Sequence, residues 1–184
     1  DAVAVPSMST FYAGQRLRAA DMNTQVRDAV NWAISAKTCR AVRNGAYSIP
    51  TGTGTFTSLP MNTEDFDVLA WHDGAGAFPS IVVPNLTGYF QVDASASFVA
   101  DARGTYRAAF LRGKSFGAGP FLFASDTAQP TAAAPTALSV STVMYMNGST
   151  DYVELVLQHD AGAAISTTVT GVPNSSLCVT FIGT

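Results

Sequence analysis

Charged residues are scarce in this sequence of 184 residues: they make up 12% of the chain, whereas apolar residues make up 47%. A chain so poor in charge leaves large weakly polar surfaces, and such surfaces are typical of association sites. We therefore expect an oligomer. No apolar run is long enough for a membrane-spanning helix, and the first residues do not have the pattern of a signal segment.

Cysteine and histidine are also rare, with two residues of each type. Cys39 and Cys178 have no metal-type or redox spacing, and we expect both thiols to be free. His72 and His159 each precede an aspartate and a Gly/Ala-rich stretch, which is typical of a turn at a strand end. No G-x-S-x-G motif stands near either histidine, so we expect no enzyme and no metal or other cofactor.

Two weaker binding hypotheses rest on other residues. Three loop aspartates could hold calcium at the apex of an oligomer, but no dense Asp/Asn loop is present, and solvated turn acids are the simpler interpretation. These residues are Asp73, Asp126 and Asp160. If the protein binds a host glycan, aromatic residues near loops are the candidates, although each fits a core position equally well. These residues are Trp71, Phe78, Phe116 and Phe121.

The few charges are distributed unevenly along the chain. Residues 1–44 carry six of the ten basic groups, namely Arg16, Arg18, Arg27, Lys37, Arg40 and Arg43. The remainder is acidic, and no Lys or Arg follows residue 114. Nucleic-acid binding needs clustered Lys and Arg, so the acidic body argues against a nucleic-acid partner.

The first part of the sequence has a helical pattern. Residues 1–14 contain Pro6 and Gly14 and read as an extended arm, whereas Ala19–Ala36 has apolar residues at helical spacing. The stripe consists of Met22, Val26, Val30 and Ala33. A helix of this length is marginal alone, so it must dock on another protein or lie parallel to copies of itself. We interpret residues 1–37 as an anchoring arm and helix.

Beyond Thr38 the pattern changes to short alternating runs separated by Gly and Pro, which predicts a β-sandwich or jelly roll over residues 38–184. The expected strands are 39–43, 46–49, 53–59, 67–71, 80–83, 88–99, 104–112, 120–124, 138–147, 151–159 and 176–183, and no second helix is needed. Alternate residues of three of these strands form the core. They are Phe90, Val92, Ala94, Ala96 and Phe98, then Val153, Leu155 and Leu157, then Leu177, Val179 and Phe181.

The opposite strand faces also carry apolar side chains. Val143 and Tyr145 alternate with Met144 and Met146, and Tyr152 and Val156 alternate with the second core set. Aromatic and Val side chains on an outward face indicate a second buried surface, as in a subunit interface.

Two parts of the sequence resemble known protein families. The segment "AGQRLRAADMNTQVRDAVNW" resembles one that opens many bacteriophage tail-fibre and minor tail proteins. The body resembles the trimeric jelly roll of the complement globular head and the tumour-necrosis-factor family. This second resemblance rests on "YSIPTGTGTFTSLPMNTEDFD", "IVVPNLTGYFQVDASASF", "TYRAAFLRGKS", "GSTDYVELVLQHDAGAAI" and "SLCVTFIGT". The collagen-like Gly repeat that often precedes the complement module is absent.

The resemblance to these families implies a mainly β jelly-roll homotrimer, with Tyr and aliphatic residues of the inward sheet on the threefold axis. By position these are Tyr89, Val143, Tyr145, Tyr152 and Val156. The function implied is a non-enzymatic virion protein, assembled in the host cytoplasm and exposed on a tail fibre or tail tip, where it binds a host glycan or protein. A capsid decoration or head-spike protein and a free-standing lectin-like module are the alternatives.

Overall fold

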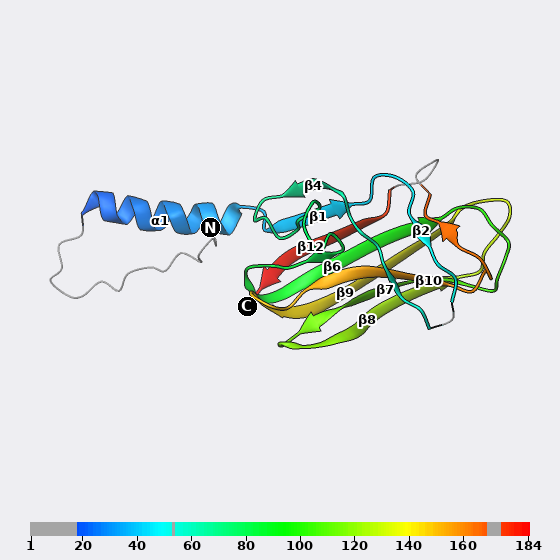
Figure 1. Cartoon of the computed structure of the whole chain (residues 1–184). Helices are drawn as coiled ribbons and strands as arrows, with labels where there is room; N and C mark the ends of the chain where they lie inside the picture. The colour runs from blue at the N-terminus through cyan, green and yellow to red at the C-terminus, as the bar shows by residue number, and fades with distance from the viewer. Residues whose placement is uncertain (1–17, 53, 169–173) are drawn as a thin grey trace. The chain divides into compact units, whose positions relative to one another are not determined.

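The computed structural model describes residues 18–52, 54–168 and 174–184. The chain divides at Lys37/Thr38 into a helical unit and a β-sheet body, at the point where the sequence pattern changes from helical to alternating (Figure 1). The extended arm expected at residues 1–14 lies outside the described residues.

The helical unit consists of α1, Ala19–Ile34, which ends two residues before the expected end. Val26 and Val30 are 47% and 49% exposed, and Ala33 is exposed as well. The side chain of Met22 lies outside the described residues. Lys37, the last residue of the unit, contacts the end of the helix. Its Nζ donates to the Trp32 carbonyl and lies 3.8 Å from the centre of the Trp32 ring. No described helix is long and apolar enough to cross a membrane.

The body is an antiparallel sandwich of two sheets with a small third pairing. The first sheet has the order β4-β1-β12-β6-β9, and the second has the order β3-β10-β7-β8, with β5 also paired to β10. The strands of the first sheet are β1 (Thr38–Val42), β4 (Thr63–Asp67), β6 (Thr87–Phe98), β9 (Thr136–Asn147) and β12 (Ser176–Gly183). Those of the second are β3 (Thr57–Ser58), β5 (Ile81–Val82), β7 (Arg107–Ser115), β8 (Ala118–Ala128) and β10 (Val153–His159), while β2 (Ser48–Ile49) pairs with β11 (Ile165–Ser166).

The hydrophobic core lies between the two sheets and uses the predicted alternate residues. Phe90, Val92 and Phe98 from β6 are fully buried, as are Leu155 and Leu157 from β10. Leu177 and Val179 of β12 join the same cluster, and Phe181 packs against it at partial exposure. The core prediction is therefore confirmed for these three strands.

One predicted strand is wrong. Asp67 is the last residue of β4, the chain turns at residues 68–69, and no strand continues to residue 71. The Asp67 carboxylate causes the turn because it accepts the backbone N–H groups of Trp71 at 3.0 Å and His72 at 2.7 Å, and Ala70 has a φ of 52°. The sequence pattern missed β4, "TEDFD", because this exposed edge strand has charged rather than apolar alternation.

Both cysteines are free, as expected. Cys39 pairs with Val179 and lies in the core, whereas Cys178 pairs with Arg40 on the outward face of the same sheet. The two side chains therefore point to opposite sides of the sheet, which prevents a disulfide. Burial raises the pKa of the Cys39 thiol, and the nearby Asp67 carboxylate raises it further.

Candidate functional site

The outward face of the first sheet is built from rows of side chains that cross its strands. One row consists of Thr38, Thr180, Gln91 and Val143, the next of Arg40, Cys178, Asp93 and Ser141, and a third of Val42, Ser176, Ser95 and Ser139. Strand pleating points every second residue to this side, and the core residues point to the other. Serine hydroxyl groups dominate the second and third rows, and the charged groups of these rows are Arg40 and Asp93.

Aromatic side chains cover one end of this face. Tyr89 pairs with Tyr145 across β6 and β9, and their rings meet edge to face at 5.6 Å. Phe116 lies flat on Tyr145, with ring centres 4.2 Å apart and an interplanar angle of 6°. We call Tyr89, Tyr145 and Phe116 the aromatic cluster. Tyr89 is 46% exposed and Phe116 is 70% exposed, so the cluster leaves a large apolar area in contact with water.

The tip of the β7–β8 hairpin holds Phe116 in place. Phe116 has a φ of 54°, in the left-handed region that residues other than Gly, Asn and Asp seldom adopt. The buried Asp151 carboxylate accepts the N–H groups of Gly117 at 2.8 Å and Asn147 at 3.0 Å, and Ser115 Oγ donates to the Tyr145 carbonyl at 2.7 Å. The fold therefore keeps an exposed aromatic ring in a strained backbone conformation, which is a frequent property of functional positions.

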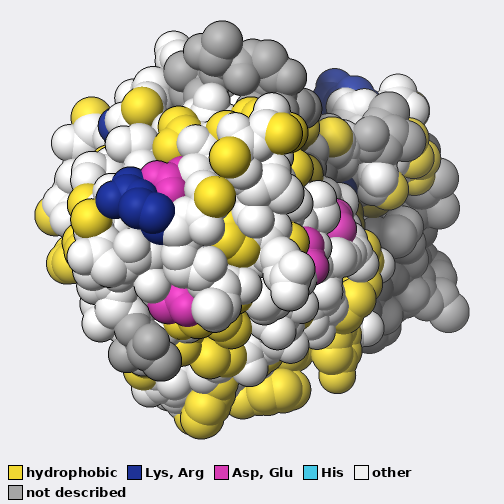
Figure 2. All heavy atoms as spheres, turned by 90° about the vertical axis from the view of Figure 1, so that its right-hand side faces the viewer, with side chains coloured by type: hydrophobic (Ala, Val, Ile, Leu, Met, Phe, Trp, Pro, Cys, Tyr) yellow, Lys and Arg dark blue, Asp and Glu magenta, His cyan; other side chains and the backbone are white. Residues whose placement is uncertain are grey.

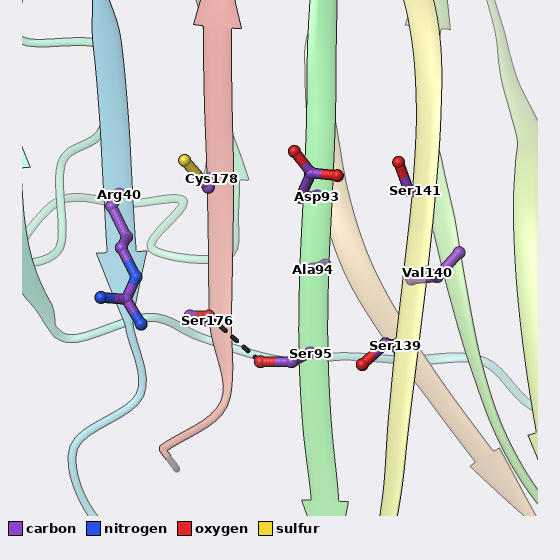
Figure 3. A pocket seen from close by; sticks show the side chains of 9 residues that line it. All are labelled: Arg40, Asp93, Ala94, Ser95, Ser139, Val140, Ser141, Ser176 and Cys178. Carbon is purple, nitrogen blue, oxygen red and sulfur yellow. Dashed lines mark hydrogen bonds between the residues drawn. The ribbon is translucent and has the colours of Figure 1, made fainter.

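A shallow hollow of about 380 Å³ lies in the polar half of the face (Figure 3). Arg40, Asp93 and Cys178 line it from β1, β6 and β12, together with serines of β6, β9 and β12. Ser95 and Ser176 bond to each other across its floor at 3.2 Å. Arg40 forms an ion pair with Asp65 at 2.7 Å, and Asp93 accepts from the Gln91 amide at 3.1 Å. The hollow therefore has one neutralised cation and one carboxylate bonded to a neutral amide.

A second exposed apolar area lies on the edge of the sandwich beside this face. β8 is the last strand of the second sheet, and β9 is the last strand of the first sheet. Phe121 and Leu122 of β8 are 53% and 47% exposed, and Val143 of β9 is 52% exposed. These exposed apolar side chains at the edge strands are further surface that a neighbouring copy can cover.

The structure brings together three of the five residues predicted for the trimer interface. Tyr89, Val143 and Tyr145 share the outward face of the first sheet. Val156 belongs to β10 of the second sheet and is fully buried between Ser58 of β3 and Phe110 of β7. It therefore exposes no surface in the single chain, and its predicted place at a subunit interface stays a prediction that this burial does not favour.

Tyr152 is also displaced from the predicted cluster. It immediately precedes β10, where its carbonyl accepts the N–H of Lys114 of β7 at 2.9 Å, so it belongs to the second sheet. Burial raises the pKa of its hydroxyl, and the nearby Glu154 raises it further. The alternation of apolar residues places Tyr152 opposite the core residue Val153, but it does not show to which of the two sheets Tyr152 belongs.

The other candidate residues lie in several separate places. Trp71, a glycan candidate, is buried, and its Nε1 donates to Asn85 Oδ1 at 2.8 Å. Phe78, Phe116 and Phe121 are exposed. Of the calcium candidates, Asp126 accepts the N–H of Ser139, and Asp160 accepts the N–H groups of Thr105 and Tyr106 and the Thr105 hydroxyl. No group of three potential metal ligands occurs in the part of the chain that the structure describes.

From the sequence, Phe116 is a candidate for glycan binding, and Asp93 and Cys178 have no predicted site role. The S-F-G segment after a predicted strand is a signal for a hairpin tip, but nothing in the sequence shows that this tip reaches back to Tyr145. Asp93 shares the face of Tyr89 by alternation along β6, whereas Cys178 joins that face only because β12 pairs with β6, which is a property of the tertiary fold.

Comparison with known proteins agrees with this fold. No family model and no curated protein matches the chain. Among solved structures, murine APRIL at pH 5.0 is similar with a TM-score of 0.58 and 10% identity, covering 80% of this chain and 100% of that chain. Eiger TNF from S. frugiperda is similar with a TM-score of 0.54 and 8% identity, covering 81% of this chain and 94% of that chain. The predicted jelly roll of the tumour-necrosis-factor type is therefore confirmed.

Proposed function

We propose that this chain is a non-enzymatic structural protein of a bacteriophage virion, a homotrimeric jelly roll on the tail exterior that is attached through residues 1–37. The proposal of a trimer is supported by the outward face of the first sheet. This face has an exposed aromatic cluster, rows of hydroxyl groups and few charges. Burying a large apolar side chain contributes about 1.5–3 kcal/mol, and three copies of the face supply many such side chains.

Low charge extends beyond this face. Figure 2 shows the end of the body on the right of Figure 1, where isolated charged side chains lie among apolar and uncharged ones. A surface of this kind fits a protein that contacts other proteins over much of its area. A host glycan or host protein is the external partner that we propose.

The virion assignment rests on the N-terminal segment. The "AGQRLRAADMNTQVRDAVNW" resemblance points to phage tail proteins, and the boundary at Lys37/Thr38 separates this segment from a body with its own core. Val26, Val30 and Ala33 are exposed on a helix of 16 residues, which needs a partner to be stable. We propose that another virion protein covers this stripe.

Cys178 provides a direct test of the interface. It lies on the proposed face, whereas Cys39 is buried and its thiol has a raised pKa, so it resists thiol reagents. We expect light scattering to show a trimer in which Cys178 reacts slowly with a maleimide and reacts faster on dilution. Cys178→Ser is the control that measures any labelling of Cys39. A stable monomer at micromolar concentration, or rapid labelling of Cys178 in an intact trimer, would contradict the proposed interface.

Deletion of residues 1–37 tests attachment. We expect the remaining body, which has its own core, to fold and form a trimer but to be missing from purified particles. Val26→Asp in the full chain should reduce incorporation and leave the melting temperature of the body unchanged. Immunogold labelling of particles then distinguishes the tail from a capsid location. A truncated body that cannot fold or trimerise would show that the helix belongs to the core of the body.

A further inference from the structure

The sequence contains two Asn-Gly pairs, Asn44-Gly45 and Asn147-Gly148, and their surroundings in the fold are opposite. Such a pair is open to a spontaneous reaction in which the backbone nitrogen of the glycine, after it loses its proton, attacks the side-chain carbon of the asparagine. Glycine favours the attack because it has no Cβ to crowd the reacting nitrogen. The reaction requires an asparagine side chain that can turn towards the glycine and a glycine N–H that no acceptor holds.

The side chain of Asn147 is held at both of its polar atoms. Its Oδ1 accepts the backbone N–H groups of Ser149 at 3.0 Å, Thr150 at 2.9 Å and Asp151 at 3.1 Å. Its Nδ2 donates to Thr150 Oγ1 at 2.9 Å. Gly148 is packed closely, because a Cβ on it would lie 2.9 Å from a main-chain carbon of a neighbouring segment. A turn of the Asn147 side chain towards Gly148 would break all of these bonds, so the fold opposes the reaction at this pair.

Asn44 lies in the turn between β1 and β2, and only its main chain is held. Asn62 Oδ1 accepts the N–H of Asn44 at 2.7 Å, and Asn62 Nδ2 donates to the Asn44 carbonyl at 2.9 Å. The side chain of Asn44 is exposed and forms no hydrogen bond with the residues that the structure describes. It can therefore turn towards Gly45 while the main chain of the turn stays in place.

Gly45 supplies the attacking nitrogen. Its N–H has no hydrogen-bond partner in the described part of the chain, and a Cβ placed on it would meet no atom within 4 Å. Arg43 Nε donates to the Gly45 carbonyl at 3.2 Å, so a cation lies beside this segment. The Asn62 amide donates to the carbonyl of the peptide group that contains the Gly45 nitrogen. Both groups favour the negative charge that this peptide group acquires when it loses its proton.

We propose that Asn44 is a site of spontaneous covalent modification by water, whereas the fold protects Asn147. The Gly45 nitrogen forms a bond to the side-chain carbon of Asn44, the bond from this carbon to Nδ2 breaks, and the nitrogen leaves as ammonia with the proton that the peptide group lost. Water then opens the cyclic imide at either of its carbonyl groups. One opening gives aspartate, and the other gives isoaspartate, in which the main chain runs through the former side chain. The balance is one water consumed and one ammonia released, with no oxidant or reductant.

The isoaspartate product changes the body at a defined place. Its main chain is one carbon longer at residue 44, so the N–H and the carbonyl of this residue can no longer both bond to Asn62. Those bonds join the β1–β2 turn to the residue that precedes β4. Conversion therefore loosens the contact between these two segments without cutting the chain. The reaction needs one body only and depends neither on the trimer nor on virion attachment.

Incubation of the full chain in mildly alkaline buffer, followed by proteolysis and mass spectrometry, measures the conversion of each Asn-Gly pair. We expect Asn44 to convert about tenfold or more faster than Asn147, because Asn147 reacts only after local opening. Both aspartate and isoaspartate should appear at position 44. The same incubation in concentrated urea is the control, and there the two pairs should convert at similar rates. Equal rates in the folded chain, a faster Asn147, an Asn44 that converts only in urea, or aspartate as the sole product would overturn the proposal.

Asn44→Gln is the matched variant for the structural consequence. The bonds to Asn62 use the main chain of residue 44, so the variant keeps them, while its longer side chain disfavours ring closure. After incubation of the parent chain, hydrogen-exchange protection of the amides of residues 43–46 should fall about tenfold or more in the isoaspartate fraction. In Asn44→Gln the protection should stay unchanged, as should that of the β6 amides in both proteins. An equal fall in the parent and the variant would refute the assigned effect of the modification.

Discussion

Replacing Phe116 with glycine should weaken the trimer without unfolding the body. The ring of Phe116 is 70% exposed in the single chain and lies on Tyr145 in the aromatic cluster. Its backbone has a φ of 54°, which glycine adopts at no steric cost. The substitution therefore removes a contact surface and a backbone strain at the same time.

The two effects have different magnitudes in the monomer and in the trimer. In the monomer, relief of the left-handed conformation gains about 1–2 kcal/mol, while loss of the stacked ring costs about 0.5–1.5 kcal/mol. The free energy of unfolding should therefore change by no more than about 1.5 kcal/mol. In the proposed trimer, covering the 70% of the ring that is exposed in the single chain would contribute about 1–2 kcal/mol per subunit. Three subunits give about 3–6 kcal/mol, which raises the dissociation constant of the trimer about 10²–10⁴-fold.

Sedimentation over a dilution series measures the dissociation constant, and urea unfolding of dilute protein measures the stability of the monomer. Phe78→Ala is the matched control, because Phe78 is also 70% exposed but belongs to the β4–β5 connection. We expect it to leave the trimer unchanged. Equal dissociation constants for the parent and Phe116→Gly, or equal weakening by both variants, would refute the role of the aromatic cluster in the interface.

Three further predictions concern the body. Hydrogen bonds from Thr105 lower the pKa of Asp160 to about 2, below its value in the unfolded chain, so this carboxylate stabilises the fold above about pH 4. That contribution should disappear as the pH falls towards 2, and Asp160→Asn should reduce this acid dependence in thermal melts. Arg107 is fully buried and donates to the Asp101, Arg103 and Tyr106 carbonyls, so Arg107→Met should lower the free energy of unfolding by about 2 kcal/mol or more in urea. Tyr152 lies near Glu154, directly before β10 of the second sheet. Because it is away from the proposed face, Tyr152→Asp should leave the sedimentation of the trimer unchanged.

The sequence predicted most of the fold because its strands follow simple alternation. The twelve-residue strand β6 and the strand β12 have apolar residues at every second position, and these residues are buried as expected except Phe181, which is partly exposed. The errors occur where another effect replaces this pattern. β4 is charged because it is an exposed edge, and β11 is only two residues long, too short to produce a pattern.

The candidate site was less predictable, since it depends on which strands are neighbours. Tyr145 and Tyr152 are seven positions apart and both carry an apolar outward side chain, yet the turn between β9 and β10 places them in different sheets. Val156 has the same alternation as a surface residue, but it is buried between Ser58 and Phe110, and no local pattern signals that covering. Phe116 reaches Tyr145 only through the hairpin tip fixed by Asp151.

The low charge of the chain has a specific consequence for the two sheets. On the face of the first sheet, Arg40 is already paired with Asp65, and the serine and threonine rows can bond to a neighbour or to each other, so the charge that covering this face has to desolvate is that of Asp93, which accepts from the Gln91 amide. The outer side of the second sheet differs, because Arg112 and Glu154 form a half-buried ion pair at 2.8 Å that is complete within one chain, with Ser58 as a further acceptor for Arg112. A contact through this part of the second sheet would cover polar groups whose hydrogen bonds are already formed within one chain. The first sheet instead leaves the aromatic cluster exposed, which is why we propose it as the face that a second and a third copy cover.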